Sequence, residues 1–168
     1  MGSLVPDKWV GNWFKASEFA CHCGECGRWE VHSDLISIAD LVREHLKVGI
    51  RINSGVRCVS HNENVGGKKN SLHLPSGADH VGCAADFSFL HSSHRHNPLN
   101  MLRVYTLFES FSRRLEYGVG LGLYATFVHF DVRGARGLKA ARWSQGFQWP
   151  NLCTERQWCF APVPWSCS

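Results

Sequence analysis

The sequence of 168 residues has no uninterrupted apolar run of the roughly 18 residues that a membrane-spanning helix needs. Its first residues also lack the long apolar stretch and the small-residue cleavage site of a secretory signal peptide, so we expect none in the chain as given. No repeat of fixed period is present, which excludes repeat arrays, coiled coils and collagen. With 44% apolar and 19% charged residues, extended disorder is not expected. These absences leave a single domain with a substantial core.

Charge of either sign is also modest. Lys and Arg together number 18 and Asp and Glu number 14, which gives a formal net charge of +4. This mildly basic balance suits an anionic partner such as nucleic acid or cell wall, but it identifies neither. Because the Lys and Arg residues are scattered and form no basic stripe, we expect no nucleic-acid partner.

Histidine and cysteine, in contrast, exceed ordinary usage. Most of the ten histidines lie between His61 and His96, and histidine is the commonest metal ligand. The eight cysteines are Cys21, Cys23, Cys26, Cys58, Cys83, Cys153, Cys159 and Cys167. Without a signal peptide, this usage favours metal ligands or reduced thiols over disulfides.

The apolar pattern predicts an α+β fold with two main helices and several short strands. The first helix is expected to begin at Asp34 with Ser33 as its cap and to stop before Gly49. Its apolar face consists of Leu35, Ile38, Ala39, Val42 and Leu46. The other expected elements are strands at 50–52, 83–89 and 140–143, a helix that begins at Asn97 and Pro98, and β structure over 117–132.

The composition changes only near the C-terminus. We interpret residues 1–143 as one domain that includes a Cys-rich segment at 17–27. Residues 144–168 are rich in Trp, Cys and Pro, and we expect them to form a tail packed on the same domain.

Three residues have the chemistry of a catalytic zinc site. Asp86 stands in an otherwise apolar strand, GCAADF, where an isolated charge is costly unless it is paired or metal-bound. His73 in NSLH and His129 in FVHF would complete a set of two imidazoles and one carboxylate, which leaves a zinc coordination position open. The alternative is a buried aspartate paired with a basic side chain, and histidines that are satisfied in the core. Arg57 in SGVR could bind a substrate carboxylate or stabilise an oxyanion, or be a surface arginine.

These motifs resemble one known family. IRINSGVRCVSHNENVGGKKNSLH, then GCAADFS, then FVHFDVRGARGLKAARW is similar to the zinc D-Ala-D-Ala carboxypeptidases, which include phage endolysins and share a fold with the Hedgehog signalling domain. The resemblance runs from about Ser17 to Trp143. It implies a small antiparallel sheet flanked by helices, Zn²⁺ held by His73, Asp86 and His129, and substrate contacts from Arg57 and Ser71.

The resemblance also implies an activity. We expect a zinc metallopeptidase that hydrolyses peptide bonds of the peptidoglycan stem, as a D,D-carboxypeptidase or as an endolysin-type endopeptidase in cell wall degradation. Zinc would polarise the scissile carbonyl, and a nearby base would move the proton. We expect a monomer without membrane insertion, of phage or bacterial origin, made in the cytoplasm and acting on the cell wall. The alternative is a non-catalytic, zinc-stabilised module that binds cell wall or a protein.

Two departures from the family pattern leave choices open. The first histidine and the aspartate are further apart than is usual, so LPSGADHV is interpreted as an inserted turn, and His80 within it is an alternative ligand. We prefer His73 because NSLH keeps the serine of the motif. Many members carry Glu or Asp where Thr126 stands. Asp131, on the same strand face as His129, would then be either the general base or a residue that orients His129.

The early cysteines form a further candidate site. Cys21, Cys23 and Cys26 predict a structural metal site or a disulfide knot, with His22 as an alternative additional ligand and Cys58 or Cys83 as a further partner. Free buried thiols are the alternative. His91, His94 and His96 in HSSHRH are interpreted as part of a solvated loop rather than as a metal site.

Overall fold

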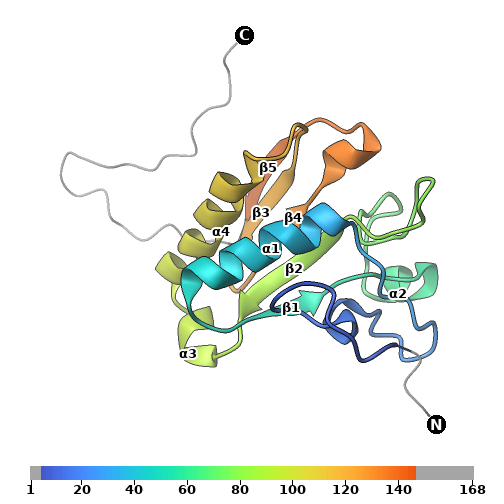
Figure 1. Cartoon of the computed structure of the whole chain (residues 1–168), viewed down its shortest axis with the longest axis horizontal. Helices are drawn as coiled ribbons and strands as arrows, with labels where there is room; N and C mark the ends of the chain where they lie inside the picture. Colours follow the sequence, from blue (N-terminus) through green and yellow to red (C-terminus); the bar gives the residue numbers. More distant parts are fainter. Residues whose placement is uncertain (1–4, 147–168) are drawn as a thin grey trace, which may run out of the picture.

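A five-stranded sheet with the strand order β1-β2-β4-β3-β5 forms the centre of the molecule (Figure 1). The computed structural model describes residues 5–146. The strands are β1 (Ile50–Ser54), β2 (Ala84–Phe89), β3 (Gly120–Tyr124), β4 (Val128–Asp131) and β5 (Ala141–Gln145). The helices are η1 (Ala16–Phe19), α1 (Ser33–Leu46), α2 (Val59–Asn64), α3 (Ser92–Arg95), α4 (Pro98–Ser112) and η2 (Arg133–Arg136). The predicted α+β fold is confirmed. The sheet is antiparallel except at its edge, where β5 pairs parallel with β3.

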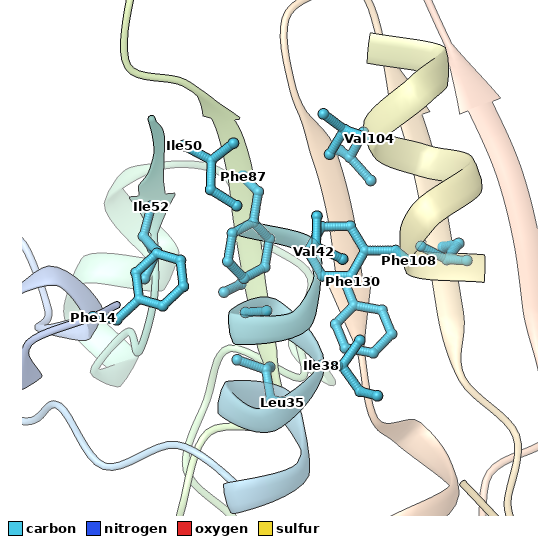
Figure 2. Packing of buried hydrophobic residues seen from close by; sticks show 14 of the residues in the cluster. Phe14, Leu35, Ile38, Val42, Ile50, Ile52, Phe87, Val104, Phe108 and Phe130 are labelled. Carbon is cyan, nitrogen blue, oxygen red and sulfur yellow. The ribbon is translucent and has the colours of Figure 1, made fainter. Parts of the chain in front are cut away.

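Helices α1 and α4 pack over one face of this sheet and enclose the core (Figures 1 and 2). The ring of Phe108 on α4 lies 4.8 Å, centroid to centroid, from those of Phe87 on β2 and Phe130 on β4. Because side chains alternate along a strand, the residues next to Phe87 and Phe130 point to the opposite face. Those neighbours include Asp86 and His129.

Both main helices form where the sequence predicts them. The expected apolar face of α1 is buried. Its N-cap, however, is His32 and not Ser33, because Nδ1 of His32 accepts a hydrogen bond from the backbone N–H of Asp34 at 3.2 Å. α4 begins as expected, with the Asn97 side chain accepting from the N–H of Leu99 at 3.0 Å and with proline in its first turn.

Some segments differ from the expectation, among them α3, a short helix over Ser92–Arg95 where a solvated loop was expected. The short helix α2, with Cys58 as its N-cap, lies where no regular element was predicted. Strand β5 runs to Gln145, two residues beyond the expected domain end at 143. Most of the tail expected over 144–168, from residue 147 on, lies outside the described residues. Within residues 5–146, no helix has the length and apolar character needed to cross a membrane.

Candidate active site and metal centre

Two neighbouring strands bring Asp86 and His129 together. β2 and β4 are antiparallel, and their register pairs these two residues directly. Nδ1 of His129 lies 2.8 Å from Oδ1 of Asp86. Since both side chains leave the sheet on the face opposite the core, an acid and an imidazole are concentrated on a rigid platform there.

His73 joins this pair from the loop that precedes β2. Its carbonyl accepts a hydrogen bond from the N–H of Arg57 at 2.9 Å, and the neighbouring carbonyl of Leu72 accepts from the N–H of Cys83 at 2.8 Å. The His73 side chain is buried, and its Nε2 lies 3.6 Å from Oδ2 of Asp86. One donor atom from each of His73, Asp86 and His129 lies within 4.8 Å of the others. We call this set the histidine centre.

The hydrogen bonds of the two imidazoles leave one nitrogen of each ring directed to Asp86. Nδ1 of His73 lies 2.7 Å from the carbonyl oxygen of Gly55, which can only accept, so this nitrogen carries the proton. Nε2 of His129 lies 3.0 Å from Oδ2 of Asp131, and Nδ1 faces Asp86. Metal-binding histidines show this arrangement, with the second N–H given to a carbonyl or a carboxylate. The donor set therefore fits a zinc ion with an open position.

Asp131 is fully buried and its oxygens are already occupied. Oδ1 accepts from the backbone N–H of Gly120 and Arg133 and from Nε of Arg133, at 2.8–3.1 Å. Oδ2 accepts from Nη2 of Arg133 at 2.7 Å and from His129. Burial alone would raise the pKa of Asp131, but the bonds from Arg133 and His129 outweigh it and lower the pKa to about 2. These contacts are those of a residue that orients an imidazole, and they leave little capacity to take up a proton.

The charges of the histidine centre shift one another's pKa values. Burial alone would raise the pKa of Asp86, but hydrogen bonds from His129 and His73 outweigh it and hold the pKa well below its usual range. Burial alone would lower the pKa of His129, but its bonds to Asp131 and Asp86 raise the pKa to about 9. For His73 burial prevails and lowers the pKa. Near neutral pH and without metal, His129 is therefore the protonated one of the two histidines, and His73 is neutral.

Arg57 and Ser71 border the histidine centre. Nη2 of Arg57 lies 3.2 Å from Oδ2 of Asp86, and Nε donates to Oγ of Ser54 at 2.8 Å. Ser71 accepts a hydrogen bond from the N–H of His73 at 3.3 Å, and it lines a cavity of about 880 Å³. The residues of the histidine centre are not part of the lining of that cavity.

Trp143 is a neighbour of the site that the sequence analysis did not single out. Its ring lies 5.3 Å from that of His129, and its Nε1 donates to the hydroxyl of Tyr124 at 3.0 Å. Gly122 faces both His129 and Trp143 in the sheet, and a Cβ there would collide with the indole. The sequence feature that could have indicated this contact is the repeated glycine of GLGLY, because Gly122 makes room for the indole of the neighbouring strand.

The other candidates lie apart from the histidine centre. His80 is exposed in the inserted turn, with φ of 54°, and within the described chain it joins no group of metal-ligand type. His91, His94 and His96 are exposed around α3. Thr126 lies in the tight turn between β3 and β4, which the N–H of Tyr124 closes onto the carbonyl of Phe127. Cys21, Cys23 and Cys26 meet Cys58 in a second group, whereas Cys83 is buried elsewhere.

Comparison with known families identifies the family of this chain. A family model described as Peptidase M15 matches residues 12–131, well over half of the chain, and this range includes every residue of the histidine centre. The chain belongs to the M15 peptidase family. The resemblance to the zinc D-Ala-D-Ala carboxypeptidases noted in the sequence is thereby confirmed, and the chain is a hydrolase of the metallopeptidase type. Comparisons of this M15 peptidase with curated proteins and with solved structures give no significant match.

Proposed function

We propose that this M15 peptidase uses zinc, held by His73, Asp86 and His129, to hydrolyse peptide bonds of the peptidoglycan stem. The observation that carries the proposal is the orientation of both imidazoles. Each gives one N–H away from the site and turns its other nitrogen to the same carboxylate. When bound, zinc supplies Lewis acidity, which polarises a carbonyl and makes water more acidic.

The chain's own residues hold and orient the substrate. Arg57 carries N–H donors at three nitrogens, and among residues 5–146 only Nε and Nη2 have side-chain partners, Ser54 and Asp86. Its remaining donors are free to take a carboxylate or a developing oxyanion of a peptide. Since the stem peptide ends in a carboxylate, this arrangement favours a substrate that is bound near its C-terminal end. Ser71, which accepts from the N–H of His73 and itself lines the neighbouring cavity, is the proposed second contact.

Asp131 is proposed as a positioning residue and not as the general base. Five hydrogen-bond donors surround its two oxygens, and its low pKa opposes proton uptake. Its role is to hold the N–H at Nε2 of His129, so that Nδ1 keeps its lone pair toward Asp86. Within residues 5–146, no carboxylate other than Asp86 and Asp131 is hydrogen-bonded to the two histidines.

That shortage of a free carboxylate supports the second candidate, a non-catalytic zinc module that binds the cell wall. Thr126 stands where many family members have their acidic base, and Asp131 is saturated. The two candidates differ in whether a bond is broken.

Digestion of purified peptidoglycan separates them. The peptidase proposal expects free D-Ala, from carboxypeptidase action, or new amino groups within cross-links, from endopeptidase action, both identified by mass spectrometry of the products. His129→Ala should release neither. Wild-type protein that is loaded with zinc, binds peptidoglycan and leaves it uncut over the whole pH range would establish the binding module.

A further inference from the structure

Four cysteines from two distant parts of the chain lie together outside the histidine centre. The sulfur atoms of Cys21, Cys23, Cys26 and Cys58 are all within 4.8 Å of one another. A tetrahedral zinc with Zn–S bonds of about 2.3 Å would place its sulfurs roughly 3.8 Å apart, so small side-chain rotations suffice to close the site. We infer that this cysteine cluster is a second, structural zinc site, independent of the proposed function of the histidine centre.

The loop that carries the first three cysteines is shaped around sulfur. The N–H of Cys21 donates to the carbonyl of Arg28 at 2.8 Å and closes the loop at its base. Gly24 and Gly27 adopt positive φ values of 77° and 60°, which turn the chain sharply around the thiols. The N–H groups of Glu25 and Cys26 point at Sγ of Cys23, at 3.4 and 3.3 Å. Backbone donors aimed at a sulfur favour its thiolate form, which is the form that binds zinc.

Cys58 arrives at the same point by packing of the main chain. Gly55 lies so close to Phe19 that a Cβ would collide with its carbonyl, and the N–H of Val56 donates to that carbonyl at 2.8 Å. Cys21 follows Phe19 by two residues, and Cys58 follows Val56 by two residues. The N–H of Cys58 donates to Sγ of Cys21 at 3.3 Å, and Sγ of Cys58 accepts from the N–H of His61 at 3.4 Å.

The composition of the cluster distinguishes it from the catalytic type of site. Four cysteine ligands close the coordination sphere of zinc and leave no position for a substrate, which is typical of structural zinc. Four thiolates and one zinc ion carry a net negative charge, and Arg28 and Lys69 line the same cavity wall as Cys26 and Cys58. Each disulfide would join only two of four sulfurs that all lie within 4.8 Å of one another, and pairing into disulfides is the competing outcome.

A zinc ion here would cross-link two segments that support the histidine centre. Cys58 directly follows Arg57, which contacts Asp86, and the carbonyl of Gly55 accepts a hydrogen bond from Nδ1 of the His73 ring. Only 16% of the Arg57 side chain is exposed, so its position depends on the backbone of residues 55–58. The cysteine cluster would therefore hold residues 55–58 against residues 21–26 without touching the substrate.

The test measures zinc per chain and the absorption spectrum after replacement by cobalt(II), on protein purified under reducing conditions. We expect one bound ion for each cluster, and an intense thiolate-to-cobalt charge-transfer band. Cys26→Ser and Cys58→Ser should each remove that band and one ion. His129→Ala should keep the band, so the cysteine site and the histidine centre fail or succeed separately.

Controls exclude general effects of losing a cysteine. Cys83→Ala removes a buried thiol outside the cluster, and a triple Ser replacement of Cys153, Cys159 and Cys167 removes those of the C-terminal segment; all of these should keep the band. If Cys58→Ser does not fold, Cys26→Ser decides, because its loop lies outside the hydrophobic core. Unchanged metal and spectrum in Cys26→Ser, or disulfides between these cysteines in the intact mass, would overturn the inference.

Discussion

Oδ2 of Asp131 lies 3.0 Å from Nε2 of His129, two residues earlier on the same strand, while Arg133 holds the carboxylate from the other side. This relationship makes the aspartate a fixed acceptor for one imidazole N–H. It determines which nitrogen of His129 faces Asp86, and it accounts for an imidazole whose pKa is raised to about 9.

Replacing Asp131 separates an orienting role from a role as base. Asp131→Asn should weaken zinc binding by about 10- to 100-fold, since the amide can turn its N–H groups toward His129 and disturb its orientation. Zinc affinity, measured by competition with a chelator, checks this. Asp40→Asn is the matched control, because Asp40 is another buried carboxylate that accepts backbone N–H groups, from Asn12 and Trp13, far from the site in sequence. Unchanged zinc affinity, with hydrolysis lowered by about 100- to 10,000-fold, would instead identify Asp131 as the base.

Replacing Arg57 tests substrate positioning. Arg57→Lys keeps the charge but loses the planar fork, so kcat/KM for a stem peptide should fall by about 100- to 1,000-fold, while zinc content stays unchanged. The matched control is Arg51→Lys, an exposed arginine of β1 whose Nε donates to Oδ1 of Asn53 at 3.0 Å. Equal kinetics for the two variants would remove Arg57 from the proposed site.

The affinity of the histidine centre for zinc should increase with pH. Zinc must displace the proton that His129 holds with a pKa of about 9, so the affinity should rise about tenfold per pH unit below that value and then level off. The difference in bound zinc between wild type and His129→Ala at each pH isolates this ion. An affinity that is flat between pH 7 and pH 8.5, roughly the window below that pKa, would contradict the assigned hydrogen bonds.

The same pKa gives the metal-free protein the opposite trend. A folded-state pKa raised above the ordinary value of 6.5 contributes stability that is complete below 6.5 and is lost as the pH rises through about 9. Chemical unfolding of the metal-free protein should therefore show a falling free energy of unfolding over this window. His129→Ala should show a weaker decline.

The cap of α1 gives a test of the fold that does not depend on metal. His32→Ala should lower the free energy of unfolding by about 1 kcal/mol, because the N–H of Asp34 loses its acceptor. Ser33→Ala should have a smaller effect, since the hydroxyl of Ser33 does not cap the helix. A larger loss for Ser33→Ala in denaturant titrations would restore Ser33 as the cap.

The sequence predicted most of the fold because apolar periodicity is local. The buried face of α1 and the Asn97–Pro98 start of α4 depend on spacings within one segment. The His32 cap was missed because histidine rarely has that role, and α2 is too short to show a period. The parallel pairing of β5 depends on contacts between segments, which one segment's pattern does not encode.

The candidate site was predictable as residue types and much less as contacts. His73, Asp86 and His129 stood out because an acid in an apolar strand needs partners. The role of Gly55 was not visible, since a carbonyl acceptor carries no side-chain signature, and the sequence analysis did not assign Arg133 to Asp131. Whether Cys58 or Cys83 joins Cys21, Cys23 and Cys26 depends on how Gly55 packs on Phe19. That contact joins segments that lie far apart in the sequence.

The return of activity to metal-free protein tests the central claim most directly. Zinc is added back to chelated wild type, His73→Ala and His80→Ala, and hydrolysis of a stem peptide is followed. The account predicts that wild type and His80→Ala regain hydrolysis as zinc is added, and that His73→Ala does not. Recovery in His73→Ala together with failure in His80→Ala would contradict it, and would place the metal on the inserted turn.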